Sequence, residues 1–321
     1  SEWIRSVDLK TPYLTHISKL VDLKQLKRSG LKITTDAMYG AGAGYLKSLL
    51  SGGSTSIKEL HGAQNPFFPG IQQPEPTPRN LRRLSKTIRE TKAHIGLATD
   101  GDADRVGAVD EEGNILTPLQ IFALLAFYLL EVKGERGAII RSITSSSMID
   151  RLGAIYGVPV VETPVGFKHI APMMIEKNAM LGGEESGGFG FRGHIPERDG
   201  ILSSLYILDL MVQTKKPLSQ LLKDLYRNVG SHHYHREDIH IPPRRKETIL
   251  DILSSQPLAL PNGYLITKSD TTDGFKYYLE DGSWVLIRFS GTEPLIRIYV
   301  ESQSLKQVDN LLTSARELIG L

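Results

Sequence analysis

The sequence predicts two related α/β domains with mixed sheets, followed by a smaller α+β domain. In the first two thirds of the chain, strand-like runs alternate with helix-like segments, and one strand–turn–helix plan occurs twice. The last third contains short alternating runs separated by Asp-Gly turns, which is typical of antiparallel strands. At 321 residues the chain is long enough for two or three domains. We expect them at residues 1–114, 115–231 and 232–321.

The first domain is predicted from a strand at residues 31–36, a turn of small residues and a helix. The turn, residues 40–44, does not have the G-x-G-x-x-G spacing of a dinucleotide site, because Tyr45 stands where that pattern needs its last glycine. A proline-rich loop then leads to a helix beginning near Leu81. A second strand, residues 95–99, runs into an acidic loop. Functional loops of α/β sheets gather at such strand ends.

The second domain repeats this plan at residues 137–157, with a serine-rich turn, and again continues into a strand and an acidic loop. It is preceded by the apolar run at residues 121–130, which is half of the roughly 20 residues that a membrane span needs. Thr117 and Pro118 before this run are a typical helix start. We therefore predict a buried helix there and no membrane partner.

The third domain is predicted as a small antiparallel sheet covered by helices. Its first segment, "SHHYHREDIHI", contains four histidines, and we interpret it as a polar strand rather than a metal site. The final segment has apolar residues at helical spacing, namely Leu305, Val308, Leu312, Ala315 and Ile319.

Composition excludes several classes of function. A net charge of +2 gives no electrostatic argument for a nucleic-acid partner or an anionic membrane surface. The absence of cysteine excludes disulfides, thiolate metal sites and a cysteine nucleophile, and it fits a reducing compartment, so we expect a cytoplasmic protein.

The motif "TDGDADR" places Asp100, Asp102 and Asp104 within five residues, directly before Arg105. On a tight loop after a strand, these carboxylates can converge on one hard cation, and the absence of cysteine or histidine nearby favours Mg²⁺ over zinc. An EF-hand would explain Glu111 at the twelfth position, but its sixth position needs glycine and has Arg105. A solvated acidic turn remains the alternative.

A glycine-rich acidic loop in the second predicted domain contains candidate binding residues. In "GGEESGGFGF" the glycines allow close approach of the backbone, and Glu184 and Ser186 could bind sugar hydroxyls. An ordinary flexible turn explains this segment equally well.

The loop "RFSGTEPLIR" has the composition of an anion-binding turn. Gly291 exposes backbone N–H groups, Ser290 and Thr292 add hydroxyls, and Arg288 and Arg297 can chelate phosphate oxygens. The alternative is a hairpin turn with flanking surface arginines.

In this order the motifs closely resemble those of the α-D-phosphohexomutases, the phosphoglucomutase/phosphomannomutase family. The resemblance runs from about Tyr13 to the end and also includes "DAMYGAGAGYL", "FFPGIQQPEPTP", "TPVGFKHI" and "ERDGI". It implies the following roles: Mg²⁺ ligands Asp100, Asp102 and Asp104; Arg105 and Lys168 beside the transferring phosphoryl group, Lys168 assisting proton movement; Glu184 and Ser186 on the sugar hydroxyls; and Arg288, Ser290, Gly291, Thr292 and Arg297 on the phosphate that is not transferred.

One departure from the family pattern is large. Members have four domains, and a phosphoserine in the first domain carries the phosphoryl group and completes the metal coordination. No matching serine loop occurs among the 321 residues, and the one Ser-His pair, Ser231-His232, stands in the wrong context. We expect the chain to correspond to domains two to four of a longer phosphoprotein, with the first domain supplied in cis or in trans.

The resemblance therefore implies an isomerase of carbohydrate metabolism that interconverts hexose 1-phosphate and hexose 6-phosphate through a bisphosphate intermediate. "GEESGG" favours glucose phosphates over mannose phosphates, and we expect the chain alone to be inactive as a mutase. The alternative from another class is a non-catalytic sugar-phosphate-binding module. A third is a Mg²⁺-dependent phosphatase with Asp100 as nucleophile.

Overall fold

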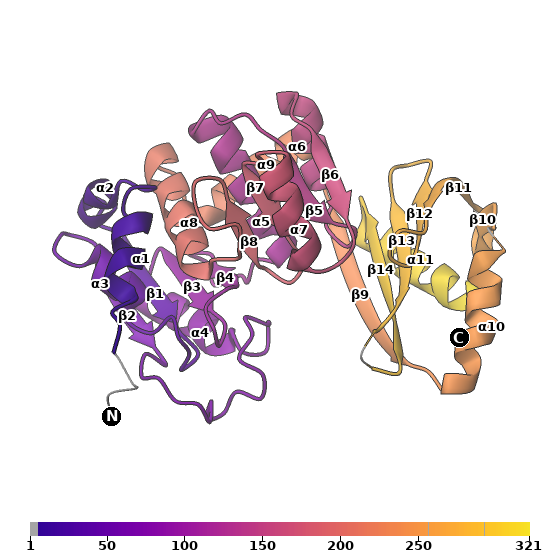
Figure 1. Cartoon of the computed structure of the whole chain (residues 1–321), viewed down its shortest axis with the longest axis horizontal. Coiled ribbons are helices and arrows are strands. Elements are labelled where there is room, and N and C mark those ends of the chain that lie inside the picture. Colours follow the sequence, from indigo (N-terminus) through magenta and orange to yellow (C-terminus); the bar gives the residue numbers. More distant parts are fainter. Residues whose placement is uncertain (1–5, 256, 292) are drawn as a thin grey trace.

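The computed structural model describes residues 6–255, 257–291 and 293–321, and its strands form three sheets. Two α/β units lie next to each other, and the third sheet lies beyond the second unit, so that helix α1 (Lys10–Ile17) and the C-terminus are at opposite ends of the molecule (Figure 1). The predicted fold class is confirmed.

The first unit has a four-stranded sheet in the order β2-β1-β3-β4. Three strands are parallel, and the fourth pairs antiparallel with β3: β1 (Lys32–Asp36), β2 (Ser56–Leu60), β3 (Ile95–Thr99) and β4 (Val106–Val109). Its helices are α1 (Lys10–Ile17), α2 (Leu23–Arg28), α3 (Tyr45–Leu50) and α4 (Arg82–Thr91). The strand predicted at residues 95–99 and the helix predicted near Leu81 are both present.

The second unit repeats this topology with the order β6-β5-β7-β8, and again its last strand is antiparallel. Its strands are β5 (Ile139–Ser142), β6 (Val160–Thr163), β7 (Leu181–Gly183) and β8 (Phe189–Phe191). Its helices are α5 (Pro118–Phe127), the π-helix η1 (Tyr128–Val132), α6 (Met148–Tyr156), α7 (Phe167–Glu176), α8 (Gly200–Thr214) and α9 (Leu218–Val229). The internal repeat predicted from the strand–turn–helix pattern is therefore real at the level of strand order.

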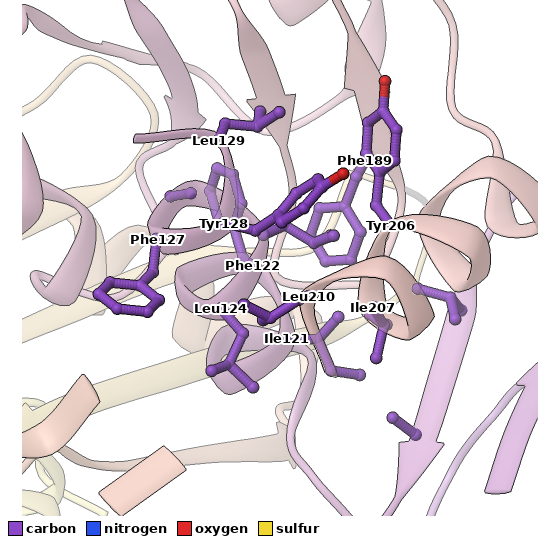
Figure 2. Packing of buried hydrophobic residues seen from close by; sticks show 14 of the residues in the cluster. Ile121, Phe122, Leu124, Phe127, Tyr128, Leu129, Phe189, Tyr206, Ile207 and Leu210 are labelled. Carbon is purple, nitrogen blue, oxygen red and sulfur yellow. The ribbon is translucent and has the colours of Figure 1, made fainter. Parts of the chain in front are cut away.

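Helix α5 lies in the main core rather than on the surface, as its apolar run predicts. Thr117 and Gln120 form a capping box at its exposed start, which satisfies backbone N–H groups that have no partner within the helix. Phe122 is fully buried and stacks on Phe189 of β8, at 5.3 Å between ring centroids, while η1 and α8 close over the same cluster (Figure 2). No helix of the described residues is both long enough and apolar enough to cross a membrane.

The third unit is a six-stranded antiparallel sheet in the order β10-β11-β12-β13-β14-β9. Its strands are β9 (His233–His240), β10 (Ala259–Leu260), β11 (Tyr264–Asp270), β12 (Phe275–Leu279), β13 (Trp284–Phe289) and β14 (Leu295–Ser302), with helices α10 (Pro243–Ser254), η2 (Pro261–Gly263) and α11 (Leu305–Leu318). The helix predicted from the apolar spacing near the end of the chain is present as α11. Its first residue, Leu305, is 66% exposed, whereas Leu311 is fully buried.

A buried polar junction holds the third sheet against the second unit. Lys276 of β12 is almost fully buried, and its Nζ donates to the carbonyl of Ile143 at 2.7 Å and to Glu162 Oε2 at 2.9 Å. Arg141 also pairs with Glu162, and despite burial these two cations hold the pKa of Glu162 below its usual value. These contacts join the third sheet to the second unit, and removing one partner would leave a buried charge unpaired.

Candidate active site

The aspartates of "TDGDADR" converge, as the sequence predicts. They occupy the tight loop between β3 and β4, and one carboxylate oxygen from each of Asp100, Asp102 and Asp104 lies within 4.8 Å of the others. Asp100 is buried, Asp104 is half-buried and Asp102 is exposed, so the cluster opens to solvent on one side. This is the one carboxylate or histidine cluster with metal-binding spacing among the described residues.

The turn of small residues between β1 and α3 fits directly against this loop. A Cβ atom at Gly40 would lie 2.4 Å from the carbonyl oxygen of Gly101, and one at Gly42 would lie 2.5 Å from Thr99 Oγ1. The N–H of Ala41 donates to the same Gly101 carbonyl at 2.9 Å. The glycines therefore allow the backbone of this turn to pack closely against the aspartate loop. This packing explains their spacing, and no dinucleotide site is needed to account for it.

Burial raises the proton affinity of two of these carboxylates, Asp100 and Asp104. Burial, followed by the neighbouring charges of Asp104 and Asp102, raises the pKa of Asp100 to about 7. Burial also raises the pKa of Asp104, although Arg198 opposes that shift. One buried oxygen, Asp104 Oδ1, has no hydrogen-bond donor within the described structure. Three carboxylates at this spacing offer hard oxygen donors that fit a bound divalent cation such as Mg²⁺.

Arg105 is held at the rim of this cluster. Its backbone N–H donates to Asp100 Oδ1 at 3.0 Å, and its Nη1 lies 3.0 Å from Glu75 Oε1 of the proline-rich loop. Despite burial, the charges of Glu75 and Asp100 hold the pKa of Arg105 above its usual value. The guanidinium is thus a fixed positive charge next to the carboxylates.

The predicted sugar loop lies directly against the aspartate loop. The N–H of Val106 donates to the carbonyl of Gly187 at 3.0 Å, and Arg105 forms a β-bridge with Gly188. Glu184 is buried between β7 and β8, and burial raises its pKa. Ser186 lies in the same turn and is half-buried. Sequence reasoning gave no grounds to expect this direct contact.

Arg198 joins the two loops and was not singled out from the sequence. Its Nη2 lies 2.6 Å from Asp104 Oδ2, and its Nη1 lies 3.5 Å from Glu184 Oε2. A Cβ at Gly188 would lie 2.2 Å from Arg198 Cδ, so this glycine leaves the space that the arginine side chain fills. Arg198 belongs to the "ERDGI" motif quoted above, but only its contacts with Asp104 and Glu184 show that it lies between the two loops.

Lys168 lies in the first turn of α7 and is exposed. Gly166, which begins this helix with a φ of +119°, donates its N–H to Glu184 Oε1 at 3.1 Å. The helix start carrying Lys168 is thereby fixed to the sugar loop.

The predicted phosphate loop connects β13 and β14. Each of its two arginines is oriented by an aspartate that the sequence did not indicate: Arg288 Nε lies 2.8 Å from Asp273 Oδ1, and Arg297 Nε lies 3.4 Å from Asp238 Oδ2.

The turn between these arginines is closed by Ser290, whose N–H donates to the carbonyl of Leu295 at 2.9 Å and whose Oγ accepts from Glu293 N at 3.3 Å. Gly291 is exposed with no atom within 4 Å of a Cβ position, and Thr292 lies outside the described residues.

A large cavity lies away from these loops. About 860 Å³ in volume, it is lined by residues including Arg28, His94 and Lys215, and His94 stands just before the start of β3 whereas the aspartates follow its end. None of the predicted site residues lines it, so the chemistry-bearing side chains and this cavity are separate features.

Family models match the chain in three consecutive blocks. The models are described as phosphoglucomutase/phosphomannomutase alpha/beta/alpha domain II at residues 11–113, alpha/beta/alpha domain III at residues 117–229 and the C-terminal domain at residues 245–318.

Two relatives are similar to this protein over most of the chain. A Methanopyrus kandleri protein provisionally named phosphoglucosamine mutase is 34% identical over 303 residues, 94% of this chain and 64% of that protein. A Thermococcus kodakarensis phosphoglucomutase/phosphomannomutase is 32% identical over 301 residues, 94% of this chain and 63% of that protein. The chain thus spans just under two thirds of the length of these relatives.

Solved structures share the fold. A Thermus thermophilus protein provisionally named phosphomannomutase has a TM-score of 0.83 and 36% identity, covering 98% of this chain and 67% of that chain. An Aspergillus fumigatus N-acetylphosphoglucosamine mutase, determined with GlcNAc-6P and magnesium, has a TM-score of 0.63 and 15% identity, covering 96% of this chain and 69% of that chain, which shows the fold alone. The three matching models belong to one family and cover nearly the whole chain in order, which confirms the resemblance of the motifs. The chain belongs to the phosphoglucomutase/phosphomannomutase family, the α-D-phosphohexomutases.

Proposed function

We propose that this chain binds Mg²⁺ and a hexose phosphate between three loops, one from each unit. Acting with a phosphoserine-bearing domain, it would interconvert hexose 1-phosphate and hexose 6-phosphate. The observation that carries the proposal is that side chains connect the three loops. Arg198 contacts both the aspartate loop and the sugar loop. Asp273 connects Arg288 of the phosphate loop to Val165, in the segment next to the sugar loop. We also propose domain boundaries at residues 1–114, 115–231 and 232–321, since each range contains one sheet.

The chemistry follows from the charges at the aspartate loop. Asp100, Asp102 and Asp104 would hold Mg²⁺, which supplies positive charge to the oxygens of a transferring phosphoryl group. Arg105, fixed by Glu75 and Asp100, would stabilise the same developing charge. Lys168 would move a proton to or from the reacting sugar hydroxyl.

Recognition of the substrate would be divided between the two other loops. Glu184 and Ser186 would form hydrogen bonds with the sugar hydroxyls. The phosphate that is not transferred would be held by the phosphate loop, namely Arg288, Ser290, Gly291, Thr292 and Arg297. This division suits a substrate that must bind in two orientations, because the same residues can contact the sugar hydroxyls in both orientations.

We propose glucose phosphate as the substrate, on the basis of the "GEESGG" form of the sugar loop. The names of several relatives, phosphoglucosamine mutase among them, favour a hexosamine phosphate as the second candidate. The magnesium in the Aspergillus structure supports Mg²⁺ at the aspartates. The lack of cysteine supports a cytoplasmic location.

Calorimetry with a panel of ligands tests the proposal. In MgCl₂, glucose 1-phosphate, glucosamine 1-phosphate and mannose 1-phosphate are titrated into the chain, with free glucose as the control. We expect a saturable signal from at least one sugar phosphate, none from glucose, and a loss of about tenfold or more in affinity for Arg288→Ala and Arg297→Ala. Arg227→Ala removes an exposed arginine of α9 and should bind like the wild type. If no sugar phosphate binds the wild-type chain, the proposal is wrong.

A coupled assay separates the mutase from the non-catalytic binding module. In a longer protein that includes the serine loop, conversion of glucose 1-phosphate to glucose 6-phosphate supports the mutase, whereas binding without conversion supports the module. An acid-labile aspartyl phosphate at Asp100 would instead support the phosphatase.

A further inference from the structure

One carboxylate bridges the third unit to the second at the site itself. Asp273 lies in the turn between β11 and β12, and its Oδ1 accepts from Arg288 Nε at 2.8 Å. Its other oxygen, Oδ2, accepts from the backbone N–H of Val165 at 2.9 Å. The side chain is 22% exposed, so both contacts are partly shielded from water. One residue thus holds an arginine of the phosphate loop and a backbone amide of another domain.

The sequence builds the turn so that Asp273 reaches Arg288. The next residue, Gly274, has a φ of +107°, which other residues rarely adopt. A Cβ there would lie 2.8 Å from the carbonyl oxygen of Ile287 and 3.1 Å from Arg288 Cβ. Glycine therefore lets the turn close onto β13 beside the arginine. The Asp-Gly pair, interpreted from the sequence as a turn, is also a contact with the phosphate loop.

The amide that Asp273 accepts from belongs to the segment that precedes Lys168. Val165 and Gly166 are consecutive, and the N–H of Gly166 donates to Glu184 Oε1 at 3.1 Å. Two adjacent amides are therefore held by two carboxylates, one from the third sheet and one from the sugar loop. A displacement of Asp273 would be transmitted through one peptide unit to Glu184 and to the helix start that carries Lys168.

The second arginine has a parallel but looser arrangement. Asp238, which lies 3.4 Å from Arg297 Nε, accepts from Arg236 Nε at 2.7 Å and Nη2 at 2.8 Å. Arg236 Nη1 in turn lies 3.7 Å from Glu185 Oε2 of the sugar loop. This route contains an extra side chain and longer distances, so Asp273 is the direct connection.

We propose that Asp273 is a positioning residue that couples occupation of the phosphate loop to the order of residues 164–168. It holds Arg288 through Nε, which leaves the two terminal nitrogens of the guanidinium oriented towards an oxyanion. It also fixes the Val165 amide, so an anion bound to Arg288 stabilises the segment leading to Lys168. The proposal rests on the proposed function only in assigning Arg288 to phosphate.

The test uses inorganic phosphate as the probe and two variants. Asp273→Asn keeps an oxygen that can accept from Val165 N–H but removes the charge that pairs with Arg288, whereas Asp273→Ala removes both contacts. Asp270→Asn is the matched control, because Asp270 accepts from Thr272 N–H in the same loop, which asparagine can also do. Calorimetry measures phosphate affinity, and hydrogen–deuterium exchange measures the peptide containing Val165 and Gly166.

We expect phosphate affinity to fall about tenfold in both Asp273 variants and to stay unchanged in Asp270→Asn. Without phosphate, exchange at residues 165–166 should be faster only in Asp273→Ala. Saturating phosphate should slow that exchange in the wild type and in Asp270→Asn but not in Asp273→Asn, which a merely structural role would not produce.

Three results would overturn the proposal: an unchanged phosphate affinity in both Asp273 variants, phosphate-dependent protection that persists in Asp273→Asn, or no phosphate binding by the wild-type chain. Failure of the proposed function is distinguishable. If no sugar phosphate binds but inorganic phosphate still protects residues 165–166 through Asp273, the substrate assignment falls and the coupling stands.

Discussion

Gly40 offers a sharp test of how the aspartate loop is supported. Replacing it with alanine adds one methyl group behind the loop without touching a carboxylate. That methyl carbon would lie 2.4 Å from the Gly101 carbonyl oxygen and 2.9 Å from the Asp100 carbonyl oxygen, both backbone atoms that cannot rotate away. We expect Gly40→Ala to fold and to bind Mg²⁺ much more weakly.

The magnitude follows from the contact distance. Ordinary contact begins at 3.4 Å, so the loop must move by roughly 1 Å to accept the methyl group. Metal–ligand distances tolerate changes of only about 0.2 Å. The expected loss in Mg²⁺ affinity is about tenfold or more, or about 1.4 kcal/mol in binding free energy. Overpacking should also lower the free energy of unfolding by about 1–3 kcal/mol.

Gly44→Ala is the matched control for this prediction. Gly44 lies in the same turn and has a φ of +77°, but no atom lies within 4 Å of its Cβ position. Alanine there should cost about 1 kcal/mol in stability through backbone strain and leave Mg²⁺ affinity unchanged. Calorimetric titration with MgCl₂ and thermal unfolding separate the two effects. Wild-type Mg²⁺ affinity in Gly40→Ala would refute the reasoning.

Three further predictions concern the aspartate loop, catalysis by the chain alone and the buried core. First, because burial and the charges of Asp104 and Asp102 raise the pKa of Asp100 to about 7, Mg²⁺ must displace a proton below that pH; calorimetry should give about tenfold weaker binding at pH 6 than at pH 8. Without metal, the folded state keeps the Asp100 proton up to about pH 7, whereas the unfolded state loses it near pH 3.8. The contribution of Asp100 to the free energy of unfolding should therefore decrease as pH rises from about 4 to about 7 and then level off. Denaturant titrations at several pH values would measure this change. Second, the 321 residues alone should produce no glucose 6-phosphate in the coupled assay, because they contain no matching serine loop; robust turnover would contradict this. Third, Phe122→Ala should lower the free energy of unfolding by about 3–5 kcal/mol, because Phe122 is fully buried against Phe189; a loss below about 1 kcal/mol in urea titration would show that this packing is not needed.

Local patterns in the sequence are sufficient to predict much of the fold. The β3 strand, the start of α4 and the buried α5 helix follow from hydrophobic runs and capping residues that act within a few positions. The spacing of the three aspartates likewise predicts their convergence, because a tight turn after a strand leaves them few other arrangements. Helical spacing predicts α11 but does not say which of its apolar residues meet solvent, and Leu305 at its start is 66% exposed.

Contacts between distant segments could not be read from local patterns. Arg198 and Asp104 are far apart in sequence and meet because Gly200 packs against the aspartate loop, where its Cβ would lie 2.3 Å from the Arg105 carbonyl oxygen. Asp273 meets Val165 because the third sheet packs against the second unit, where the buried Lys276 contacts the carbonyl of Ile143. Such pairs depend on how the domains are oriented, which no short motif of the sequence specifies.

The most direct test is a crystal structure of the chain grown with MnCl₂ and glucose 1-phosphate, with anomalous data recorded for manganese. The account predicts a manganese peak within about 2.0–2.5 Å of oxygens from Asp100, Asp102 and Asp104. It also predicts the phosphate on Arg288 and Arg297 and the sugar beside Glu184. A manganese peak away from the three aspartates, or a sugar phosphate bound without contact to either arginine, would contradict the claim that these loops form one site.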